Sequence, residues 1–332
     1  MTTEQHLLQR RTDLLSARYP VLKPVLDAFP DAPPGDRRRL SELMLDVLEH
    51  DHLVEDAERG ELWAALVDAA GSPAHRDDLV RNAIVLNMLG IVALARPRDF
   101  RALVSLVDLA GHETVANVHD QIDQMARTTA GLRWTTELIR RLQAPTTGPG
   151  RQVDAAEGSV LTPEELDVCA QAAVELLLRG VEAAGDQTVD PILTSAGFWH
   201  LTEHGDAHRW RLHLASVAAD PWGEHASCLV TFARAAERPG IATTIERCTR
   251  RFRTAAEDAE RRAIAEHIGA LVRISGLPQQ TFAARVGTSP SRMSTYVRGQ
   301  VTPSATMVLR MKRVASRLAP EHADDEERLT DG

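Results

Sequence analysis

The segment PQQTFAARVGTSPSRMSTYVRGQ, residues 278–300, decides how the C-terminal part of this 332-residue chain folds. It carries three arginines and no acidic residue. Phe282, Ala283 and Val286 have the spacing of one helix face, and Gly287 directly after them is typical of a tight turn. The segment therefore predicts two short helices separated by a sharp turn.

The flanking sequence extends this pattern to four short helices between about residues 262 and 318. The first is expected to end at Gly276 in a left-handed C-cap, and the second to run from Gln279 to Val286. The third is expected to begin with Ser289 as its N-cap and to stop at Gly299. The fourth, capped by Ser304, has apolar residues expected to close the bundle, namely Val308, Leu309, Met311, Val314 and Leu318.

This pattern resembles the helix-turn-helix of lambda-repressor-like, or Xre-type, transcriptional regulators. The resemblance is carried by Gln279 at the start of a helix, by FAARVGTS (282–289) and by YVRGQVTPS (296–304). It is confined to about the last sixth of the chain. It implies a DNA-binding domain over residues 261–319, whose recognition helix, about Ser289–Arg298, lies in the major groove.

Carried over position by position, the resemblance implies two sets of DNA-contacting residues. The residues expected to read base edges are Ser291, Arg292, Ser294 and Thr295. Those expected at DNA phosphates are Gln279, Ser289 and Arg298, with Arg285 and Gln300 as additions. An arginine can bind guanine O6 and N7 through two hydrogen bonds, and hydroxyl groups can donate or accept at several base edges.

Two prolines depart from the family pattern. Pro278 stands where many relatives have a Ser or Thr cap, so the helix after it is expected to start less firmly. Pro290 stands where some repressors have a base-reading Gln, so that contact is lost. Sequence readout is therefore expected to depend more on DNA shape or on a second half-site.

Charge is distributed unevenly along the chain, whose net charge is −9. From Arg261 to Ala319, ten Lys and Arg residues accompany a single acid, Glu266. The tail, residues 320–332, has six acids and one Arg, and we expect it to be disordered. One basic module attached to an acidic body favours a polyanionic partner for that module.

The composition predicts an all-α protein. Ala, Leu, Arg and Glu recur throughout, aromatic residues make up 4%, and the two-residue alternation of exposed strands is missing. Only Lys23 and Lys312 of the 38 basic residues are lysines, which is typical of an actinobacterial-type, GC-rich genome.

The body before the basic module is expected to have two helical parts. Residues 1–143 read as a helical domain for dimerisation, sensing or partner docking, and the Pro- and Gly-rich residues 144–161 as a linker. A second helical region, 162–260, starts with a capping box at Thr162-Pro163-Glu164-Glu165. A long helix is expected to lead from Ile241 towards Gly276, although two helices with a kink would give the same pattern.

Several classes of protein fit the sequence poorly. The three cysteines lack a CxxC pair, the start lacks a signal-peptide pattern, and the longest apolar run is too short for a membrane span, so a cytoplasmic chain with no membrane segment is expected. Phosphate-cradling and nucleophile motifs are missing, so neither an enzyme nor a cofactor is predicted.

The region around residues 199–225 is rich in His and Trp. His200, His204 and His208 have helical spacing, but Gly205-Asp206 is expected to break the helix between them, so no metal site is predicted. The tryptophans Trp199, Trp210 and Trp222 are interpreted as core anchors rather than as a ligand pocket.

These features predict a sequence-specific transcriptional regulator that binds double-stranded DNA through its C-terminal module. A homodimer is expected, because one such module buries little surface and reads one half-site. Residues 1–260 would dimerise, sense a small-molecule effector or bind a protein partner. The alternative is a protein-interaction scaffold, such as an antitoxin or adaptor, with secondary DNA binding.

Overall fold

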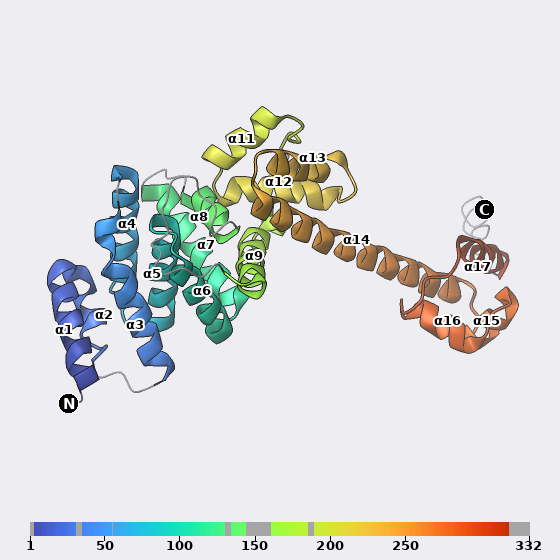
Figure 1. Cartoon of the computed structure of the whole chain (residues 1–332). Helices are drawn as coiled ribbons and strands as arrows, with labels where there is room; N and C mark the ends of the chain where they lie inside the picture. The colour runs from blue at the N-terminus through green and yellow to red at the C-terminus, as the bar shows by residue number, and fades with distance from the viewer. Residues whose placement is uncertain are drawn as a thin grey trace, which may run out of the picture. The chain divides into compact units, whose positions relative to one another are not determined.

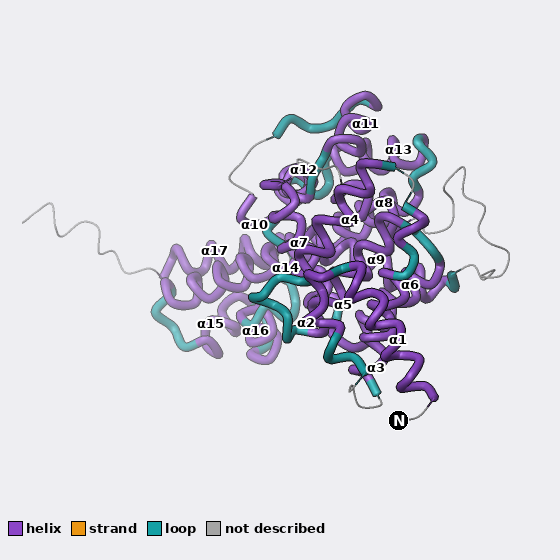
Figure 2. Tube along the Cα trace, turned by 90° about the vertical axis from the view of Figure 1, so that its left-hand side faces the viewer, coloured by secondary structure: helices purple, strands orange, loops and turns teal. Residues whose placement is uncertain are grey.

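The computed structural model describes residues 3–30, 35–54, 56–129, 134–143, 161–184 and 189–318. These residues form helices joined by turns and loops, with no strand among them, which confirms the all-α prediction (Figure 2). The α-helices are α1 (Thr3–Arg18), α2 (Lys23–Leu26), α3 (Asp36–Leu48), α4 (Ala57–Ala70), α5 (Leu79–Ala93), α6 (Pro97–Ala110), α7 (His112–Thr129), α8 (Trp134–Gln143), α9 (Pro163–Leu178), α10 (Val181–Ala184), α11 (Ser195–His204), α12 (Ala207–Ala219), α13 (Glu224–Ala235), α14 (Pro239–Ile274), α15 (Gln279–Val286), α16 (Pro290–Val297) and α17 (Ala305–Leu318). Two short 3-10 helices are η1 (Pro20–Leu22) and η2 (Asp51–Leu53).

The chain divides into two compact units, Met1–Arg250 and Arg251–Gly332. The long helix expected after Ile241 is present as α14, a single helix of 36 residues that contributes to both units. Gly269 is accommodated inside it. Each unit has its own buried residues and is described separately.

The expected separation of residues 1–143 from residues 162–260 does not appear in the structure. Helix α9 packs against α6, α7 and α8, so both helical regions belong to the first unit. The unit boundary falls after Arg250 rather than after residue 260. The apolar faces on the two sides of the Pro- and Gly-rich segment bury each other, which local sequence does not reveal. The segment itself, 144–160, and the acidic tail lie outside the described residues.

Helix α5 is the centre of the first unit. It packs against α3, α4, α6, α7 and α8 (Figure 1). Every residue from Arg81 to Ala93 is buried. A helix that is apolar on nearly all sides can be stable only in such a position. Its buried Asn87 side chain donates a hydrogen bond of 2.7 Å to the Asp99 carbonyl, which offsets the cost of burying an amide.

Two local features of the first unit, a helix cap and three tryptophans, can be compared with their predictions. The capping box at α9 is confirmed: the Glu165 amide donates to Thr162 Oγ1 at 3.2 Å, and the Thr162 amide donates to the Glu165 carboxylate at 2.8 Å. Of the three tryptophans interpreted as core anchors, Trp210 is buried. Trp199 and Trp222 are exposed, so the prediction is wrong for these two.

His119 on α7 makes the stability of the first unit sensitive to acid. Its ring is fully buried, neither ring nitrogen has a hydrogen-bond partner among the described residues, and burial lowers its pKa to about 4. An unfolded chain has an ordinary histidine pKa of about 6.5. The stability that depends on a neutral His119 is therefore full above pH 6.5 and is lost as the pH falls towards 4.

We expect His119→Leu to remove part of this acid sensitivity. Between pH 7 and pH 5 the wild type should lose about 2 kcal/mol more stability than the variant. Urea unfolding followed by tryptophan fluorescence measures this, because all five tryptophans lie in the first unit. His213 and His225 also have lowered pKa values, so the variant keeps some pH dependence. Identical pH dependence in the two proteins would contradict the prediction.

Candidate nucleic-acid interface

The second unit is a cluster of four helices around one small core. The end of α14 is followed by α15, α16 and α17, which gather at that end of the helix (Figure 1). Each helix contributes buried side chains at the spacing of one face. The core residues are Ile268, Leu271, Phe282, Ala283, Val286, Met293, Tyr296, Met311 and Ala315.

Helix α17 contributes fewer of the predicted residues to the core, since Val308 and Leu318 are half-buried and do not belong to the core cluster. Leu309 is 57% exposed, so the expectation that it closes the bundle is wrong. Met311 and Ala315 are buried, with Met307 packed partly against them. At 100° per residue, position 309 lies on the opposite side of the helix from the row 307, 311 and 315.

Gly287 forms the tight turn between α15 and α16, as predicted. Its φ of 75° is left-handed, and its amide donates to the Ala284 carbonyl at 3.2 Å. The Thr288 amide donates to the Ala283 carbonyl at 3.0 Å, which completes a Schellman motif. The turn is held from α17 as well, because Arg310 Nη1 donates to the Val286 carbonyl at 3.3 Å.

The start of each helix follows the side-chain chemistry of its cap. Ser289 Oγ accepts a hydrogen bond from the Arg292 amide at 3.1 Å, and Pro290 occupies the first turn of α16, as predicted. Pro278 before α15 offers no side-chain cap, in agreement with the expected weaker start. Helix α16 is thus fixed at its start by a cap and a turn.

The four residues expected to read bases lie on α16 on the side away from the core. Ser291 and Arg292 are exposed, and Ser294 and Thr295 are half-buried. Thr295 Oγ1 donates a hydrogen bond of 2.8 Å to the Arg292 carbonyl. Its hydroxyl proton is therefore committed to the helix, and only its oxygen lone pairs remain to accept a bond from a ligand.

The five residues expected at phosphates lie at the ends of the two short helices. Gln279, half-buried, begins α15, and Arg285, exposed, lies in its last turn. Ser289 precedes α16, while Arg298 and Gln300 follow it, and all three are exposed. Helix starts present unsatisfied N–H groups and partial positive charge, which suits anions.

The second unit carries many cations and little internal compensation for them. All ten Lys and Arg residues between 261 and 317 are exposed, and of these Arg261 alone forms an ion pair within the described chain, with Asp258. Arg298 also borders a hollow of about 790 Å³ that includes Arg261, Arg262 and Arg273 together with the acids Asp258 and Glu266. Exposed guanidinium groups without carboxylate partners can neutralise phosphates.

Two features of this surface were not predicted from the sequence. The contact of Arg310 with the turn joins residues 24 positions apart, and no motif marks it. The hollow beside Arg298 needs the last turns of α14, which lie before the residues 279–304 that carry the resemblance. In both cases the signal is spatial proximity across helices.

The described residues contain neither a cluster of metal-ligating side chains nor a membrane-spanning helix. No group of three or more His, Cys, Asp and Glu side chains in the described ranges could hold a metal ion. Gly205 ends α11, so His208 lies on α12, apart from the stacked rings of His200 and His204. No described helix combines the length and the apolar composition that crossing a bilayer requires.

In comparisons with known proteins, no family model, no curated protein and no solved structure matches this chain significantly. The interpretation of the second unit therefore depends on its own residues.

Replacing Gly287 tests how far the turn holds the two short helices. Gly287→Ala forces a residue with a Cβ into the left-handed backbone conformation, which costs roughly 1–2 kcal/mol. The added Cβ would lie 3.4 Å from Arg310 Nη1. We expect amide protection in α15 and α16 to fall about tenfold by hydrogen-exchange mass spectrometry of the full chain. Gly269→Ala is the control, since its Cβ meets nothing within 4 Å and Ala favours the helix. Equal loss of protection in both variants would contradict this role.

Proposed function

We propose that the chain is a sequence-specific DNA-binding protein that regulates transcription through its second unit, as an Xre-type helix-turn-helix. The observation that carries the proposal is the outer face of α16, where Ser291, Arg292, Ser294 and Thr295 lie on a helix fixed by a cap and a glycine turn. The surrounding cations supply the affinity for a polyanion.

Helix α16 has dimensions that suit the major groove. An α-helix with its side chains is about 10–12 Å across, which fits the major groove of B-DNA, about 12 Å wide. Arg292 is exposed and has no carboxylate partner in the described chain, so its guanidinium can bind guanine O6 and N7. Ser291 and the oxygen of Thr295 would add single hydrogen bonds. Each bidentate pair contributes roughly 1–3 kcal/mol of discrimination between bases.

The five residues expected at DNA phosphates would hold α16 in a fixed position along the DNA duplex. Gln279 and Ser289 lie where helix starts offer N–H groups, and Arg285, Arg298 and Gln300 extend this set at the helix ends. Contacts of this kind position a protein on the duplex without reading sequence. With few direct base contacts in one module, a homodimer on two half-sites would raise specificity. The protein would act in the cytoplasm, with the first unit dimerising, sensing an effector or binding a partner.

Selection from a pool of random duplexes tests the proposal directly. The full-length chain at about 150 mM salt should recover a repeated or palindromic motif. Arg292→Ala should lose preference at one position of each half-site, with a cost of roughly 1–3 kcal/mol on the selected site. Arg76→Ala, which removes an exposed arginine from the first unit, is the charge-matched control and should recover the wild-type motif. Weak, unselective binding that salt abolishes would instead favour the scaffold.

Arg298→Ala separates positioning from readout. We expect its affinity to fall by a similar factor for the selected site and for random duplex, because a phosphate contact does not depend on sequence. The slope of log K against log salt concentration should decrease by about 1. Fluorescence anisotropy over a salt series measures both quantities. An unchanged slope, or a loss limited to the selected site, would place Arg298 away from the phosphates.

A further inference from the structure

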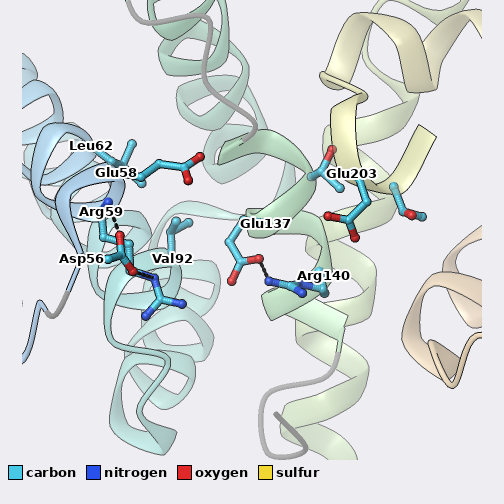
Figure 3. Close-up of a pocket in the computed structure, with 10 residues that line it drawn as sticks. Asp56, Glu58, Arg59, Leu62, Val92, Glu137, Arg140 and Glu203 are labelled. Carbon is cyan, nitrogen blue, oxygen red and sulfur yellow. Dashed lines mark hydrogen bonds and ion pairs between the residues drawn. The ribbon is translucent and has the colours of Figure 1, made fainter. Parts of the chain in front are cut away.

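The first unit contains a pocket that the DNA-binding proposal does not use. It lies between α4, α5, α8 and α11 and has a volume of about 230 Å³ (Figure 3). At about 30 Å³ per atom, the share of one water molecule in the liquid, this volume holds roughly eight non-hydrogen atoms. Part of its wall is apolar, formed by the buried side chains of Leu62 and Val92.

The cations at the pocket are compensated unequally. Arg59 has its own partner, since its Nε lies 3.3 Å from Asp56 Oδ2. Arg140 shares the Glu137 carboxylate with Arg141, so one negative charge serves two guanidinium groups. Burial and then the charges of Arg141 and Arg238 lower the pKa of Arg140 to about 10. An additional anionic group beside Arg140 would therefore be stabilised.

The carboxylates of Glu58 and Glu203 add negative charge to the lining of the same pocket. Neither forms an ion pair with any described residue, although the charge of Glu203 acts on Arg140. Figure 3 shows Glu58 on α4 and Glu203 on α11 at opposite sides of the pocket, with Glu137 and Arg140 on α8 between them. Positive and negative groups thus line the same small volume without neutralising one another completely.

We propose that this pocket binds a small zwitterion of the amino-acid type. Its carboxylate would pair with Arg140, its ammonium group with Glu203, and its aliphatic part would lie on Leu62 and Val92. A ligand with only a positive charge gives Arg140 no further carboxylate partner, so Arg140 still shares Glu137 with Arg141. A ligand with only a negative charge is repelled by the carboxylates of Glu58 and Glu203. A molecule with both charges compensates both sets, and its size fits the volume. The site needs no DNA and stands apart from the function proposed for the second unit.

A matched set of ligands with one five-carbon skeleton tests the charge requirement. Isothermal titration of the full-length chain would use 5-aminopentanoate and L-norvaline as zwitterions with different charge spacing, pentylamine as the cation and pentanoate as the anion. We expect at least one zwitterion to bind about tenfold more tightly than either singly charged ligand. The proposal is overturned if neither zwitterion binds more tightly than pentylamine and pentanoate.

Single substitutions then assign the two ends of the ligand. Glu203→Gln should lower zwitterion affinity about tenfold, to that of pentanoate, and leave pentanoate binding undiminished. Arg140→Gln should do the converse, reducing the zwitterion to the affinity of pentylamine. Glu61→Gln, an exposed glutamate on α4 outside the pocket, is the control and should bind as the wild type does.

The exposed Glu203 keeps the test decisive even if Arg140→Gln perturbs α8. Tryptophan fluorescence unfolding, which reports on the first unit, identifies any variant that is unfolded. If folded Glu203→Gln binds the zwitterion as tightly as Glu61→Gln does, the proposed site is wrong. Since no step involves DNA, this outcome leaves the proposed function of the second unit unaffected.

Discussion

The left-handed turn at Gly287 is the constraint on which the surface of the second unit depends. Two backbone hydrogen bonds close it, Arg310 holds it from α17, and Ser289 caps the next helix immediately after it. These contacts set the direction in which α16 leaves α15 and bring Met293 into the core. Ser291 lies about 200° around the helix from the inward-facing Met293 and therefore points outward, and Arg292 is exposed beside it. The candidate interface is therefore a geometric result of the turn and its caps.

The sequence predicted the turn between α15 and α16 and the starts of α16 and α9 well, because these signals are local. Gly287, Ser289 and the Thr162 capping box act over three or four residues, a range within which side-chain chemistry decides the backbone. The grouping of α9 with α6, α7 and α8 depends on apolar faces far apart in the chain, and the composition break before Thr162 concealed it. Leu309 was misplaced because residues 307–309 are all apolar, so apolar character alone does not show which of them faces the core.

The candidate pocket illustrates a different limit. Its charged groups come from α4, α8 and α11, and each looks like an ordinary surface residue in its own segment. Only the packing of these helices brings Arg140 near Glu203. In contrast, all the DNA-contacting candidates lie within 22 consecutive residues, from Gln279 to Gln300, so a linear motif can indicate them. Sites assembled from distant helices leave no such pattern.

Nine of the ten exposed cations between Arg261 and Arg317 are arginines, and Lys312 is the exception. A guanidinium group stays protonated at every pH at which the chain is folded, and it is less strongly hydrated than an ammonium group. Lysine acetylation, which removes charge from many basic surfaces, could neutralise one position here. The positive charge of this surface is thus almost independent of pH, and only competing anions, salt or the rest of the protein could weaken its attraction for a polyanion.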